Sequence, residues 1–175
     1  MKKIGLLFLG SILLFSCGRD NKKEEAETSS EQKEVVVADN YAITLEAIYE
    51  KDDELLLVFK KAGYWDYDHP IKFKIVGQPN IQNIRIDAPQ GLSMENVQVD
   101  LSSNKEQKYV TLRGVNILNN EKVVINGANN MHAKYFDMGN SVGWDPKGLR
   151  YIMNFDGEYP PRMVGNEQLE AVLVK

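Results

Sequence analysis

Residues 41–49 read Tyr-Ala-Ile-Thr-Leu-Glu-Ala-Ile-Tyr. Apolar side chains fall on every second position from Tyr41 to Tyr49, and Thr44 and Glu46 lie between them. A β-strand points successive side chains to opposite faces, so this period of two places one face against a core and the other toward water. The stretch therefore predicts a half-buried strand of a β-rich domain.

The same alternation recurs further along the chain. Residues 71–75 and 97–101 repeat it, whereas residues 55–59 are apolar at every position, which is typical of a strand in the centre of a sheet. Shorter runs predict further strands at residues 84–87, 109–112, 115–118, 123–126, 149–155 and 169–174. About ten strands are expected in all.

The joints between these strands favour antiparallel pairing. Residues 51–53 join the first two strands, and Asn119-Asn120 suits a tight hairpin because asparagine tolerates the left-handed conformation. No long helical period separates the strands, which argues against parallel βαβ winding. The one helical candidate covers residues 129–138. The predicted fold class is therefore all-β, an antiparallel β-sandwich of jelly-roll or immunoglobulin-like type with at most one short helix.

The N-terminus has the composition of an export signal. Lys2 and Lys3 precede an apolar stretch of about 12 residues, which is shorter than the roughly 20 needed to cross a bilayer. The stretch is followed by Ser16 and Cys17, the only cysteine of the chain. This run resembles a bacterial lipobox, although Phe15 is larger than the residue usual there. The resemblance implies that residues 1–16 are removed and that Cys17 is acylated, which anchors the protein firmly to a membrane. The alternative is an ordinary signal peptide in which the cysteine is coincidental.

Residues 17–39 are expected to form a tether. Residues 18–39 include no aromatic residue and are rich in charged residues, serine and threonine. They therefore cannot bury enough apolar area to fold. Lys23-Glu24-Glu25 resembles the export signal of some Bacteroidota lipoproteins, but lies further from the cysteine than usual. The predicted location is the cell envelope, lipid-anchored at the outer membrane and facing the periplasm or the surface. Residues 40–175 are then one β-sandwich domain.

Composition and motifs exclude several functions. The net charge is −4 without a basic cluster, so nucleic acid is not an expected partner. The domain has no cysteine and only His69 and His132, which is insufficient for a zinc site; both histidines are interpreted as surface or packing residues. Nucleophile-elbow, phosphate-loop and dinucleotide motifs are absent, so we expect no cofactor and no enzyme activity. A carboxylate pair for glycoside hydrolysis would show only in the fold.

Two segments concentrate aromatic residues between predicted strands, at residues 63–70 and 140–148. Aromatic rings stack on sugars and neighbouring carboxylates accept hydroxyl hydrogen bonds, which makes these segments candidates for a glycan-binding patch. The candidate residues are Tyr64, Trp65, Asp66, Tyr67, Trp144 and Asp145. The same rings are equally suited to closing the end of a sandwich. A third alternative is a Ca²⁺ site that joins Asp66 and Asp68 to Asp145.

Residues 70–160, with their sandwich strands and the Val97–Leu101 stretch, resemble domains of uncharacterised Bacteroidota lipoproteins and envelope proteins, some of which look like carbohydrate-binding modules. The resemblance transfers no catalytic residue. We therefore expect a membrane-anchored, noncatalytic lipoprotein that binds a glycan or an envelope polymer. The alternative is an interaction or assembly component of an envelope complex, which holds a protein partner at a sheet edge or face.

Overall fold

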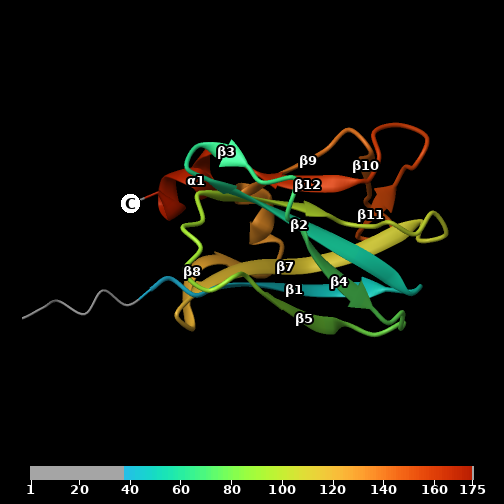
Figure 1. Ribbon diagram of the computed structural model, residues 1–175. Helices are drawn as coiled ribbons and strands as arrows, with labels where there is room; N and C mark the ends of the chain where they lie inside the picture. The colour runs from blue at the N-terminus through green and yellow to red at the C-terminus, as the bar shows by residue number, and fades with distance from the viewer. Residues whose placement is uncertain (1–37, 175) are drawn as a thin grey trace, which may run out of the picture. The chain divides into compact units, whose positions relative to one another are not determined.

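Two antiparallel sheets packed against each other make up the computed structural model, which describes residues 38–174 (Figure 1). Each sheet has six strands in this part of the chain. Alternate residues of both sheets point inward to a shared apolar core, as the period-two pattern predicts. The predicted antiparallel β-sandwich is confirmed.

The first sheet, sheet A, is built around the longest strand. Its order is β10 (Val142–Asp145), β11 (Arg150–Met153), β7 (Tyr109–Asn119), β1 (Tyr41–Tyr49) and β5 (Gln82–Asp87), and β8 (Lys122–Gly127) also pairs with β7. The two short strands predicted at residues 109–112 and 115–118 are therefore one continuous strand, β7. The predicted strand at 149–155 is the shorter β11.

The second sheet, sheet B, has a central strand that is apolar on both faces. Its order is β3 (Tyr64–Trp65), β2 (Asp53–Lys61), β6 (Asn96–Asp100), β12 (Arg162–Gly165) and β9 (Phe136–Met138), and β4 (Ile71–Ile75) also pairs with β2. β2 has β6 on one side and β3 and β4 on the other, which confirms the prediction that residues 55–59 lie inside a sheet.

The two predicted turns have different outcomes. β7 and β8 form a tight hairpin in which Asn119 pairs with Lys122, and Asn120 and Glu121 take φ values of 48° and 63°, as predicted. Residues 51–53, by contrast, carry the chain from sheet A to sheet B, so β1 and β2 do not pair. The buried Asp53 carboxylate fixes this crossing because it accepts hydrogen bonds from the Ser102 hydroxyl and from backbone N–H groups.

Two predicted elements are wrong. Residues 169–174 lie largely in a helix, α1 (Glu167–Leu173). The Asn166 side chain caps the N-terminus of this helix. Its core contacts come from Leu169, Val172 and Leu173, and this spacing is that of a helix face. The predicted helix at 129–138 is only the 3₁₀ turn η1 (Met131–Lys134), followed by β9. In the part of the chain that the structure describes, no helix is long and apolar enough to cross a membrane.

Candidate functional site

Trp65 lies on a two-residue strand at the edge of sheet B. β3 pairs with the end of β2, so Trp65 is opposite Lys60 and Tyr64 is opposite Lys61. The turn between the strands is Ala62-Gly63, with φ values of 47° and 80°. Glycine adopts this conformation without strain, and its N–H donates to the carboxylate of Glu95 at 2.8 Å. The hairpin therefore holds the two rings at a defined place on the sheet edge.

Beyond Trp65 the chain leaves the sheet edge and returns to it at β4. The N–H of Asp66 still donates to the Phe59 carbonyl at 2.9 Å, and regular pairing resumes where Ile71 meets Leu57. Residues 66–70 thus bulge out of the sheet. The bulge is held by the Asp66 carboxylate.

Asp66 joins the bulge to the strand behind it. Its two oxygens contact Lys61 Nζ at 2.5 Å and His69 Nδ1 at 2.8 Å. The hydrogen bond from Lys61, and then that from His69, lowers the pKa of Asp66 to about 2. The carboxylate is therefore ionised at neutral pH and already has cationic or N–H partners.

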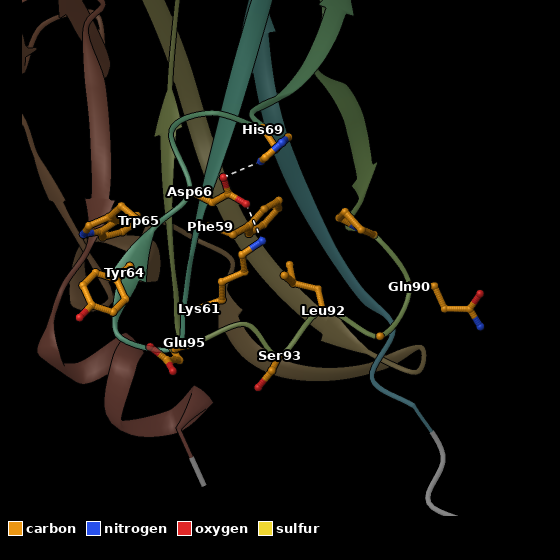
Figure 2. Close-up of a pocket in the computed structure, with 13 residues that line it drawn as sticks. Phe59, Lys61, Tyr64, Trp65, Asp66, His69, Gln90, Leu92, Ser93 and Glu95 are labelled. Atoms are coloured by element: carbon orange, nitrogen blue, oxygen red, sulfur yellow. Dashed lines mark hydrogen bonds and ion pairs between the residues drawn. The ribbon is translucent and has the colours of Figure 1, made fainter.

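A cavity of about 1040 Å³ lies between this hairpin and the connection from β5 to β6, residues 88–95. Figure 2 shows Lys61, Asp66 and His69 joined to one another beside Phe59, with the rings of Tyr64 and Trp65 further along the hairpin. Apolar lining also comes from Pro89 and Leu92 of the connection. The cavity has the volume of a small-molecule or short oligomer site, with an apolar wall and a few fixed polar groups.

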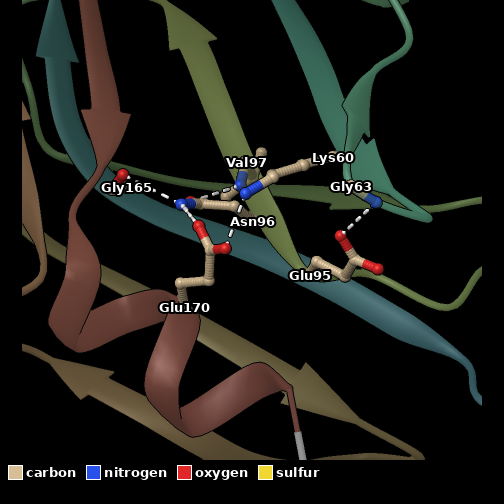
Figure 3. A network of polar contacts seen from close by, with 7 residues as sticks. All are labelled: Lys60, Gly63, Glu95, Asn96, Val97, Gly165 and Glu170. Atoms are coloured by element: carbon tan, nitrogen blue, oxygen red, sulfur yellow. Dashed lines mark hydrogen bonds and ion pairs between the residues drawn. The ribbon is translucent and has the colours of Figure 1, made fainter.

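A second cavity, of about 500 Å³, also has Trp65 in its wall. Here the polar groups come from the start of β6 and from α1. Glu170 accepts from Lys60 Nζ at 2.6 Å and from the Asn96 amide at 3.1 Å, and the same amide reaches the Gly165 carbonyl at 3.0 Å (Figure 3). The hydrogen bonds from Lys60 and then Asn96 lower the pKa of Glu170. Trp65 is the aromatic residue that the two cavities share.

The second predicted aromatic segment lies on the other sheet. Trp144 is in β10, opposite Tyr151, and the centroids of the two rings are 5.0 Å apart. Tyr151 in turn has its hydroxyl 2.9 Å from Nε2 of the buried His132. Trp144, Tyr151 and Leu149 border a smaller hollow of about 320 Å³. This hollow and the two cavities at Trp65 share no lining residue.

Asp145 is engaged within its own hairpin. One carboxylate oxygen accepts from the N–H groups of Lys147 and Gly148, and the other contacts Arg150 Nε at 3.2 Å. The Gly148 N–H, and then Arg150, lower the pKa of Asp145. Within residues 38–174 no three His, Cys, Asp or Glu side chains are grouped as a metal ion requires, so Asp66, Asp68 and Asp145 do not converge on a Ca²⁺.

The predicted candidates therefore divide into two groups. Tyr64, Trp65 and Asp66 line one cavity, and Tyr67 stands beside Trp65 with its ring centroid 6.4 Å away. Trp144 and Asp145 lie apart from them on sheet A. Both tryptophans are on short edge strands, not in loops as predicted. Cys17 lies outside the described residues.

Most of these rings are open to solvent. Tyr64 is 80% exposed, Tyr67 58% and Trp144 48%, whereas Trp65 is partly buried. The alternative in which the rings close the end of the sandwich therefore does not describe Tyr64, Tyr67 or Trp144. His69 is a surface residue and His132 a packing residue, as interpreted from the sequence.

Several wall residues were not predicted. Lys60, Lys61 and Glu95 flank the hairpin, while Asn96 and Glu170 come from β6 and α1. Gly63, between an apolar run and two aromatics, is a turn signal, and a turn there makes the two lysines before it neighbours of the rings. No local signal points to Glu170. Comparison with protein-family models, with curated proteins and with solved structures gives no match to this chain.

Proposed function

We propose that this protein is a noncatalytic binding module that holds a glycan or a similar envelope polymer at Trp65. The observation that carries the proposal is the position of Trp65, in the wall of two cavities and partly open to solvent. A partly buried ring is held in a fixed orientation and still offers a face on which a sugar ring stacks. The amides and carboxylates beside it supply acceptors and donors for hydroxyl groups.

Two of the carboxylates around Trp65, Asp66 and Glu170, are better suited to binding than to acid catalysis. Hydrolysis of a glycoside requires one carboxyl group that keeps its proton near neutral pH, and this demands a raised pKa. Asp66 and Glu170 have the opposite property, because lysine and other donors lower the pKa of both. These two carboxylates are therefore suited to accepting hydrogen bonds and unsuited to donating a proton.

A glycan array tests the proposal directly. The probe is the full chain with Cys17→Ser, compared with the same chain carrying Trp65→Ala or Trp144→Ala. We expect the wild-type site to bind a glycan, Trp65→Ala to abolish the signal, and Trp144→Ala to keep it. Thermal melts establish that each variant is folded. A folded protein that binds no glycan contradicts the proposal and leaves the protein-partner alternative, which crosslinking in cells then tests.

We also propose that the domain is held at the cell envelope, at the outer membrane, by lipid on Cys17. The support is the resemblance of the N-terminal run to a lipobox, in residues outside the described part of the chain. Two or more acyl chains are needed for stable anchoring, and a triacylated cysteine meets this requirement. Cys17→Ser should transfer the protein from the membrane fraction to the soluble fraction. A variant that stays with the membrane, or a wild-type mass without lipid, would refute the anchor.

A further inference from the structure

Trp65 lies where a ligand can pass from one face of sheet B to the other. Lys60 borders the smaller cavity and Lys61 the larger one, and successive strand residues point to opposite faces. The hairpin of β2 and β3 therefore lies between the two cavities. β3 is only two residues long and lies at one end of the strand order, so the path around it past Trp65 is short.

The two cavities offer different surroundings to successive units of such a ligand. Phe59 and Leu92 give the larger cavity an apolar wall. In the smaller cavity, Gln168 and Asp137 present an amide and a carboxylate group. A monomer occupies only one of these sites. A linear polymer that bends over Trp65 gains contacts in both, and its second contact is intramolecular.

The charges around the two cavities restrict the charge of the polymer that can bind there. Five carboxylates line them together with two lysines, and both lysines are already paired, Lys61 with Asp66 and Lys60 with Glu170. Within residues 38–174, the other three carboxylates have no ion-pair partner: Glu95, Asp137 and Glu167. Among the described residues, Glu95 accepts a hydrogen bond only from the Gly63 N–H. An acidic polymer would meet repulsion without a free cation to offset it.

We infer that the ligand is a linear polysaccharide without acidic groups, bound by an internal stretch that bends over Trp65 and occupies both cavities at once. This inference rests on the proposed function. It adds two properties, a dependence of affinity on chain length and a selection against negative charge, that a single stacking site would not have.

The test uses three matched series of β-1,4-linked oligomers, of glucose, of glucosamine and of glucuronic acid, titrated calorimetrically into the Cys17→Ser chain. We expect the hexasaccharides of the first two series to bind about tenfold more tightly than their disaccharides. The acidic hexasaccharide should bind at least about tenfold more weakly than the glucose hexasaccharide.

Variants then assign the two contacts. His69→Ala changes only the larger cavity and Gln168→Ala only the smaller one, and both side chains are exposed, so folding is preserved. In each of these two variants, the hexasaccharide should lose most of its advantage in affinity over the disaccharide. Trp144→Ala should keep that advantage. Affinity that does not depend on length, equal binding of the acidic series, or no binding of any series by a protein that is positive on the array overturns this inference. A protein that is negative on the array instead overturns the proposed function.

Discussion

Trp65 and Trp144 have similar sequence surroundings and different structural ones. Each lies on a short edge strand and is followed directly by an aspartate. Trp65 borders cavities of about 1040 and 500 Å³, whereas Trp144 borders a hollow of about 320 Å³. The difference lies in what stands behind each ring. Trp144 leans on Tyr151 and through it on the buried His132, while Trp65 has the exposed Tyr67 beside it.

The two aspartates differ in the same sense. Asp145 uses its oxygens on Lys147, Gly148 and Arg150 and so closes its own hairpin turn. Asp66 also has its partners close in sequence, Lys61 five residues before it and His69 three after it, but it forms part of the wall of the larger cavity. An aromatic residue followed by an acid is therefore no sufficient signature of a binding site. What distinguishes the two is that Asp66 lines the cavity beside its tryptophan, whereas Asp145 does not line the hollow beside Trp144.

Removal of the tyrosine ring next to each tryptophan should give the largest difference in stability between the two regions. Tyr151→Ala deletes a ring that contacts Trp144 and leaves Nε2 of His132 without its hydrogen-bond partner, so we expect a loss of about 3 kcal/mol in the free energy of unfolding. Tyr67→Ala should change it by less than about 0.5 kcal/mol, because that side chain is exposed. Urea denaturation measures both. Equal effects of the two substitutions would contradict the contrast between the regions.

The two tryptophans themselves should separate binding from stability. On the glycan that the array identifies, Trp65→Ala should lose roughly 2 kcal/mol of binding free energy, or about 30-fold in Kd, which is the scale of an aromatic anchor. Trp144→Ala should leave Kd unchanged and lower the melting temperature. Calorimetric titration and thermal melts of the same preparations give both numbers. If Trp144→Ala weakens binding as much as Trp65→Ala, the ligand reaches sheet A.

The fold was predictable wherever one face of a strand is buried. The alternation at residues 41–49 predicts β1 in full, because a slip of one residue would expose its whole apolar face. The run from Leu169 to Val174 failed because a short apolar run satisfies both a strand and a helix. The Asn166 cap, a local feature, decides between them.

The site was predictable only in its aromatic part. Lys60 and Glu170, which form one wall, are 110 residues apart in the chain, and only the packing of α1 beside β6 brings them together. The composition of Asp145-Pro146-Lys147-Gly148, by contrast, is that of a turn. That composition is a signal for the local role of Asp145, which we instead predicted to be part of a binding patch.

The region behind Trp144 should make stability sensitive to mild acid. Burial lowers the pKa of His132 below its usual value of 6.5, so the unfolded chain takes up a proton near pH 6.5 while the folded chain does not. The free energy of unfolding should therefore fall as the pH decreases from 7 toward 5. His132→Gln should flatten this slope, and Tyr151→Phe, which keeps the histidine, should retain it. An unchanged slope in His132→Gln would assign the effect to other groups.

The region around Trp65 should respond to pH only in much stronger acid, and locally. The pKa of Asp66 is lowered from 3.8 to about 2, so its contribution to the order of the bulge is complete above pH 3.8 and is lost as the pH falls toward 2. NMR titration of the Asp66 carboxyl carbon should give a midpoint near 2, with the His69 ring signals moving in parallel. Lys61→Met removes the first cause of the shift and should raise the midpoint. A midpoint near 3.8 in the wild-type chain would mean that Asp66 is not held against Lys61. The wall of the larger cavity would then lack a fixed carboxylate, and Asp66 would no longer differ from Asp145 as a part of a binding site.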